Sequence, residues 1–139
     1  ESGKLKSEIL AIPTMPQFRT IRCVKGAYTL TGQDANVSFD DSLCVGGDFE
    51  KKGVWYEIPY RCFFTREADN VIAAGRIISA SDEAWNAVRV IPIAALSGEV
   101  SGLIAALSVK KGTPVHGLGL NDLHEEIARR DLTLHGFAD

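Results

Sequence analysis

The 139-residue sequence lacks several features that would assign a function at once. It contains no G-x-G-x-x-G turn, the glycine pattern with which a strand–turn–helix unit holds a dinucleotide. It contains no uninterrupted apolar run of about 18 residues and no recognisable secretory signal. Its net charge is −3, and its basic residues are scattered. We therefore expect neither nucleic acid nor a membrane as a partner.

Cysteine is scarce and odd in number, with only Cys23, Cys44 and Cys62. No two of them have the close spacing of a zinc site or a redox dithiol. We therefore expect buried free thiols and no metal site, since cysteine behaves as a small apolar residue. Free thiols favour a reducing compartment, and a cytoplasmic location is the expectation that follows.

The most informative segment starts at Val71. The apolar run Val71 to Ala74 predicts a short strand buried on both faces, and it ends at Gly75, where a ligand could approach the backbone. Pro92 then suits the first turn of a long helix. Strand, glycine and helix N-terminus together predict a place for an anionic or electron-rich group.

The rest of the chain predicts a mixed α and β fold of class α+β with few strands. The long helix should run from about Pro92 to Lys110, with Gly112 as its C-cap, and a C-terminal helix should begin near Asn121. Shorter elements are expected as strands over 18–24, 27–30 and 55–58 and as a short helix or turn over 39–45.

A single two-faced strand without a strand–helix–strand partner is unusual, because such a unit needs about 30 residues of regular alternation. The chain therefore reads as the closing piece of a larger α/β protein.

Six motifs in order resemble the C-terminal part of bacterial FAD-dependent oxidoreductases with a two-domain, Rossmann-type architecture. The likeness covers about Met15 to His135. The motifs are Phe18–Arg22, Gly26–Thr31, Phe39–Asp41 followed by Gly46-Gly47, Tyr56–Arg61, Asp69–Ala80 and Glu83–Pro92.

The resemblance implies one C-terminal fragment, 1–139, made of part of a Rossmann-type FAD-binding fold and part of a substrate domain. Residues of about 15–65 would belong to the substrate domain, 66–111 would close the FAD site, and 112–139 would form a tail with a helix. The whole enzyme would pass a hydride between a small-molecule substrate and the flavin. Its missing N-terminal portion would be the partner of this chain, and a homo-oligomer is also expected.

The resemblance also gives roles to particular residues. Ala74, Gly75 and Arg76 would lie beside the FAD pyrophosphate or ribityl chain. Backbone groups of Val90, Ile91 and Ile93 would face the flavin pyrimidine oxygen, where a helix N-terminus stabilises negative charge. Residues that would bind substrate, or else form ion pairs, are Arg89 and Arg61.

Two departures from the family limit the carry-over. The missing glycine fingerprint predicts that the isolated chain binds FAD poorly and is inactive. A histidine that often follows Gly46-Gly47 in the family is absent, so the catalytic residues stay unknown.

Two other readings remain open at this stage. One is a non-catalytic binding or oligomerisation module that uses the small-residue face of the long helix. The other is a small autonomous enzyme with Arg76, Arg89 and Asp82 in an anion pocket.

Overall fold

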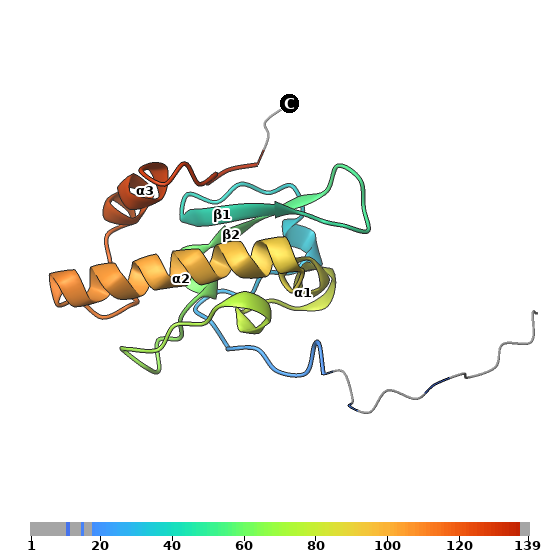
Figure 1. Cartoon of the computed structure of the whole chain (residues 1–139), viewed down its shortest axis with the longest axis horizontal. Coiled ribbons are helices and arrows are strands. Elements are labelled where there is room, and N and C mark those ends of the chain that lie inside the picture. The colour runs from blue at the N-terminus through green and yellow to red at the C-terminus, as the bar shows by residue number, and fades with distance from the viewer. Residues whose placement is uncertain (1–10, 12–14, 16–17, 137–139) are drawn as a thin grey trace, which may run out of the picture.

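A computed structural model describes residue 11, residue 15 and residues 18–136, and it shows a small α+β fold (Figure 1). Strands β1 (Ser42–Gly47) and β2 (Trp55–Pro59) form an antiparallel pair. Helices α1 (Asp82–Val88), α2 (Ile91–Lys111) and α3 (Leu120–Ala128) follow in the second half of the chain. The expected fold class, with few strands, a long helix and a C-terminal helix, is confirmed.

One strand of the two-stranded sheet was predicted from the sequence, and the other was not. Strand β2 includes the expected residues 55–58 and ends at Pro59. The short helix or turn expected over 39–45 is present only as a turn at Asp40 and Asp41, and its extension to Val45 is wrong. Residues from Ser42 onward belong to β1, where Val45 pairs with Glu57. Leu43 and Cys44 are both fully buried, so long-range packing decides the conformation there over the local turn signals.

The predicted two-faced strand over Val71 to Ala74 is also wrong. Val71 is 47% exposed, and Ile72 makes only an isolated bridge to Phe64. Ala73 is the buried member of the segment, and its N–H donates to the Phe63 carbonyl at 2.7 Å. The segment runs along α2 outside the sheet.

No strand forms over 18–24 or 27–30 either, although both segments stay close to the chain around Ile77. Val24 N–H donates to the Ile77 carbonyl at 2.8 Å, and Leu30 forms a single parallel bridge with Ala80. Isolated bridges satisfy some backbone groups without building a ladder.

Helix α2 has the boundaries that its sequence signals predict. It begins beside Pro92 and ends at Gly112, whose φ of +59° gives the left-handed C-cap that glycine favours. Lys110 and Lys111 occupy the last turn, where positive charge suits the helix dipole. Helix α3 buries Leu123 and Ile127, as its spacing predicts.

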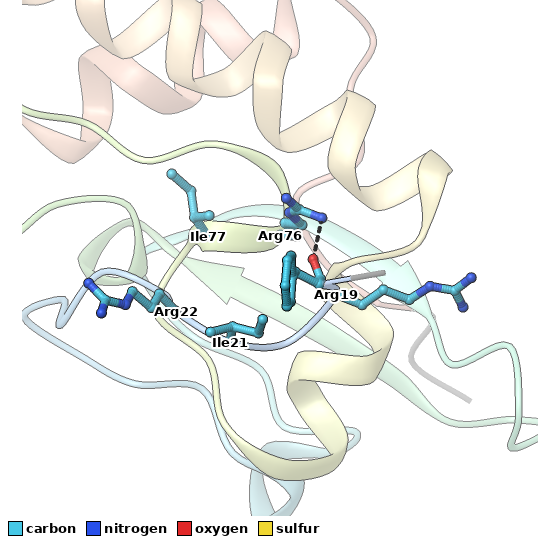
Figure 2. A pocket seen from close by; sticks show the side chains of 6 residues that line it. Arg19, Ile21, Arg22, Arg76 and Ile77 are labelled. Atoms are coloured by element: carbon cyan, nitrogen blue, oxygen red, sulfur yellow. Dashed lines mark hydrogen bonds between the residues drawn. The ribbon is translucent and has the colours of Figure 1, made fainter. Parts of the chain in front are cut away.

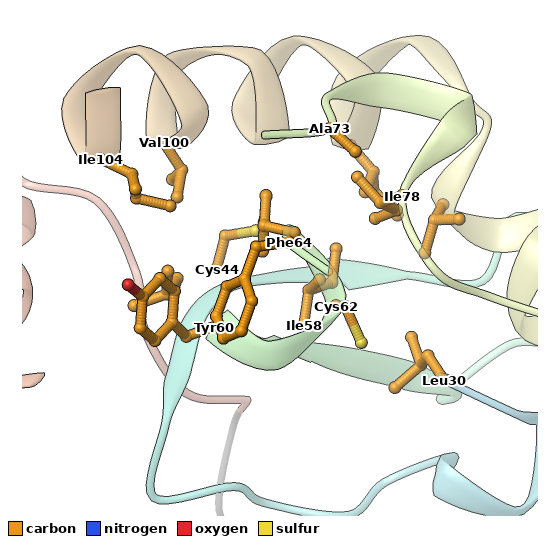
Figure 3. Close-up of a cluster of buried hydrophobic side chains, with 14 of the residues drawn as sticks. Leu30, Cys44, Ile58, Tyr60, Cys62, Phe64, Ala73, Ile78, Val100 and Ile104 are labelled. Atoms are coloured by element: carbon orange, nitrogen blue, oxygen red, sulfur yellow. The ribbon is translucent and has the colours of Figure 1, made fainter. Parts of the chain in front are cut away.

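The core lies between α2 and the face of the sheet that it covers (Figures 1 and 3). Val100 and Ile104 of α2 point toward Cys44, Ile58 and Phe64 (Figure 3). Cys44 and Cys62 are free and buried, and Cys23 is free and half-buried, which confirms the expected free thiols. The division of the chain into substrate-domain and FAD-domain parts stays a prediction.

Helix α2 is also long and apolar enough to cross a membrane by composition alone. Its mean hydropathy is 1.6, and 39% of its most apolar window is buried inside the molecule. A core helix passes the same test, so a single helix of this kind is weak evidence for a span.

Candidate functional site

Two serines of α2 hold the segment that leads to Gly75. The Gly75 N–H donates to Ser97 Oγ at 2.9 Å, and Ser101 Oγ donates to the Ala73 carbonyl at 2.8 Å. Both serines are buried, and they lie four residues apart on one face of the helix. The Gly75 N–H and the Ala73 carbonyl have no partner in a strand, and the two serines supply the hydrogen bonds that buried backbone groups need. The segment is thus fixed against the N-terminal half of α2.

Gly75 begins a short 3-10 turn, η3 (Gly75–Ile77), in a left-handed conformation with φ of +65°. A Cβ at this position would lie 3.7 Å from the Cβ of Ala94, which is ordinary contact, so packing does not demand glycine. The left-handed conformation favours glycine, and Gly75 is half-buried. The Gly75 N–H already donates to Ser97 Oγ, so a ligand would contact Gly75 at its Cα.

Arg76 follows and is exposed at the same place. Its Nη1 donates to the Phe18 carbonyl at 2.8 Å, and its own carbonyl accepts from Trp85 Nε1 at 2.8 Å. Trp85 of α1 therefore fixes the backbone of η3, while the guanidinium stays at the surface. This hydrogen bond gives Trp85 a positioning role.

The N-terminus of α2 carries no side-chain cap. Val90 occupies the N-cap position and offers no acceptor, and the first turn holds no acidic residue. The N–H groups of Ile91 and Ile93 precede the first ladder bond, which runs from Ala94 N–H to the Val90 carbonyl at 2.8 Å. Pro92 has no N–H of its own. The positive end of a 21-residue helix is thus left without a negative partner from its own N-cap side chain or first turn.

Three of the expected cofactor residues at this end differ in what they present. The Ile91 side chain is 85% exposed, whereas that of Ile93 is 3% exposed and packs on Gly46. The Val90 N–H is used within the protein, because it donates to the Ala87 carbonyl at 3.3 Å. Ile91 therefore has its backbone N–H at an exposed position, whereas Ile93 is buried and Val90 uses its N–H within the protein.

A surface hollow of about 460 Å³ lies beside η3 (Figure 2). Its rim combines apolar side chains with arginines, and several of the apolar ones are well exposed: Phe18 by 61%, Ile21 by 57% and Ile77 by 46%. The residues that line it are Phe18, Arg19, Ile21, Arg22, Arg76 and Ile77. Cationic groups between apolar faces suit a ligand that is anionic in one part and apolar in another.

The two arginines expected to bind substrate lie outside the residues that line this hollow. Arg61 makes a two-pronged pair with Asp41, through Nε at 2.8 Å and Nη2 at 3.0 Å. The hydrogen-bonded Asp41 carboxylate raises the pKa of Arg61, and the guanidinium also lies 4.9 Å from the centroid of the Tyr28 ring. Arg61 is therefore engaged in holding the fold.

Arg89 is less committed. It is half-buried at the C-cap of α1, directly before Val90, and its Nε donates to Asn86 Oδ1 at 3.2 Å. Its position in the chain keeps it next to the uncapped end of α2. Asp41 is not available near this end of α2, because it is the ion-pair partner of Arg61.

The structure thus brings Ala74, Gly75 and Arg76 against the N-terminal half of α2, as the order of motifs predicted. Sequence reasoning missed Ser97 and Ser101 as the residues that hold them there. Their spacing of four within an apolar helix was the available signal. Among residues 18–136, together with residues 11 and 15, no group of three metal-ligating side chains gathers.

Comparison with known protein families identifies a family for this chain. The family described as FAD dependent oxidoreductase matches residues 2–127, most of the chain. No curated protein and no solved structure matches it. The motifs that lead from Phe18 to Pro92 lie inside the matched range, and so do η3 and the start of α2. The chain therefore belongs to the FAD dependent oxidoreductase family.

Proposed function

We propose that this chain closes the FAD site of a larger oxidoreductase, with η3 and the N-terminus of α2 as the closing wall. The observation that carries the proposal is the uncapped start of α2 beside the left-handed Gly75 and the exposed Arg76. Membership of the family supports FAD as the group that binds there. When bound, FAD supplies the group that exchanges a hydride with a substrate.

The residues present fit such a group in three ways. The N–H group of Ile91, at the exposed start of α2, would donate to an electron-rich oxygen, and the helix dipole would favour negative charge there. Arg76 would supply a positive charge for a phosphate. Gly75 would let the ligand approach the backbone, since a side chain at that position would stand in the way.

The phosphate-binding fingerprint of the family is absent from this sequence, so most of the contacts to the FAD phosphates would come from another part of the protein. We accordingly propose that this chain alone binds FAD weakly and lacks activity. The substrate would be a small molecule that reaches the flavin from the side of this chain. Arg89, next to the start of α2, is the better placed of the two arginines to meet it.

The test compares two glycine substitutions in the protein that carries this chain together with its fingerprint-bearing portion. Gly75→Ala and Gly53→Ala both place alanine at positive φ, +65° and +79°, and neither added Cβ collides with the chain. Each should lose about 1 to 2 kcal/mol of stability through the left-handed conformation. Gly53 lies in the loop between β1 and β2, so it serves as the matched control.

We expect Gly75→Ala to weaken FAD binding by about tenfold or more, as the equivalent of about 1.4 kcal/mol, while Gly53→Ala leaves it unchanged. Flavin absorbance and the thermal midpoint of the holoprotein are the two measurements. Equal FAD affinity in both variants would contradict the placement of Gly75 in the wall. Micromolar FAD binding by the isolated chain would contradict the proposed division of the site.

One observation favours a second function, an interface between copies of the chain. On the outer side of α2, a Cβ added at Gly98 or Gly102 would meet nothing within 4 Å, and Val109 is 84% exposed. Small residues allow another backbone to approach closely. Sedimentation that shows a dimer in the wild type and a monomer in Gly102→Arg would support this role for the helix.

A further inference from the structure

The C-terminal segment after α3 returns across the sheet, outside the residues that the family matches. The match ends at residue 127, and α3 ends at Ala128. The chain then turns at Asp131, with φ of +54°, and passes beside the sheet (Figure 1). We call residues 131–136 the strap.

A buried carboxylate of β2 holds the end of the strap. Glu57 is 0% exposed, and its Oε1 accepts from the Gly136 N–H at 2.9 Å. Its Oε2 lies 3.1 Å from His135 Nδ1. The loop before β1 supplies two further donors, the Phe39 N–H at 2.8 Å and Ser38 Oγ at 3.2 Å. A buried charge needs such a full set of donors, and here half of that set comes from the strap.

Packing reinforces this attachment at two neighbouring points. Gly136 lies so close to Trp55 that an added Cβ would come within 2.5 Å of the indole ring. The Leu134 carbonyl accepts a hydrogen bond from Ser42 Oγ of β1. The strap therefore contacts both strands of the sheet.

A hollow of about 530 Å³ lies where the strap, the sheet and α2 meet. The strap contributes Asp131, Leu132 and Thr133, and α2 contributes Leu96. The remaining lining residues come from the β1–β2 hairpin: Val45, Gly46, Gly47, Gly53, Val54 and Trp55. The surface there is mostly apolar, so lifting the strap would expose apolar groups to solvent.

We propose that residues 131–136 form a releasable strap over the β1–β2 hairpin, latched by the Glu57 carboxylate and opened when that carboxylate loses its charge. A protonated Glu57 would carry a hydrogen where Gly136 or Phe39 now donates, and the charge-assisted bonds would be lost. In the described part of the chain, His135 is the titratable group that contacts Glu57, and it lies on the strap itself. The loop before β1 contributes only uncharged donors, from Ser38 and Phe39.

The strap is tested in the 139-residue chain through the fluorescence of Trp55. The chain has two tryptophans, so Trp85→Phe leaves Trp55 as the single reporter. In this background, Gly136→Ala should lift the strap, because the added Cβ collides with the indole while Glu57 and the sheet are left intact. Acrylamide quenching of Trp55 should then rise severalfold. Gly98→Ala is the matched control, since its Cβ meets open space.

A second variant, Glu57→Gln, tests the latch. Its amide nitrogen would face an N–H donor, so quenching should be high at every pH. In the parent background, quenching should rise on acidification before far-UV circular dichroism changes. The proposal is overturned if Gly136→Ala quenches like Gly98→Ala, or if quenching in the parent rises only together with global unfolding. If Glu57→Gln does not fold, those two comparisons still decide.

Discussion

The contact between Gly46 and Ile93 joins the sheet to the first turn of α2, and it supports a quantitative prediction. A Cβ added at Gly46 would lie 2.3 Å from both Cγ1 and Cδ1 of Ile93, far inside the ordinary contact range of 3.4–4 Å. Ile93 is only 3% exposed, so its side chain cannot swing out into solvent. We expect Gly46→Ala to destabilise the fold by about 1 to 3 kcal/mol through overpacking.

The second half of this prediction uses a double-mutant cycle. Ile93→Ala alone should cost about 2 to 5 kcal/mol, because it leaves a cavity in the core. It also removes both clashing atoms, and the nearest remaining atom is the Ile93 Cβ at 3.6 Å. The double variant should therefore be no less stable than Ile93→Ala alone, which corresponds to a coupling of about 1 to 3 kcal/mol.

Urea unfolding followed by far-UV circular dichroism gives the free energies of unfolding for the four proteins of the cycle. Gly47→Ala is the control, since its added Cβ would lie 3.8 Å from the nearest atom, the Val54 carbonyl oxygen. Additive effects of Gly46→Ala and Ile93→Ala would refute the reasoning. In that case, the close contact between α2 and Gly46 of β1 would not be what positions the start of α2.

Two further predictions concern buried titratable groups. Burial raises the pKa of Glu57, but hydrogen bonds from the Phe39 and Gly136 N–H groups and from His135 outweigh it and leave the pKa below its ordinary value. Its contribution to stability is therefore present above the ordinary carboxyl pKa and is lost as the pH falls through the lowered value, and Glu57→Gln should flatten the acid side of a plot of thermal midpoint against pH. A variant with the same acid dependence as the wild type would contradict this. Burial raises the pKa of Cys44 and of Cys62 to about 12, so a thiol reagent at neutral pH should leave both unlabelled in the folded protein, as mass spectrometry of labelled peptides would show, and rapid labelling of either would disprove their burial.

Local signals in the sequence were sufficient for both ends of α2 and for the start and inner face of α3. Pro92 and Gly112 bound α2 because one has a fixed φ and the other adopts a positive φ, and both preferences act within a turn. Leu123 and Ile127 face inward because the helical period places them on one side. The order of the motifs likewise predicted that Gly75 and Arg76 would lie near the start of α2.

The strands were harder, because a strand depends on its partner. Gly46 and Gly47 directly follow the segment that was predicted as a short helix or turn, yet both belong to β1, where Gly46 leaves room for Ile93. The segment from Val71 to Ala74 reads as a buried strand, yet its backbone groups are met in part by Ser101. In both cases the deciding contact comes from a residue far along the chain, which no local pattern reveals.

The sequence by itself determined where α2 begins and ends, about where α3 begins, which thiols are free, and which family the chain resembles. These properties depend on residue type and on neighbours within a turn or two. Only the tertiary structure decided that Ser97 fastens Gly75, that Asp41 occupies Arg61, and that Glu57 holds the end of the chain. Each of those pairs is at least 20 residues apart, and folding is what brings its members within hydrogen-bonding distance.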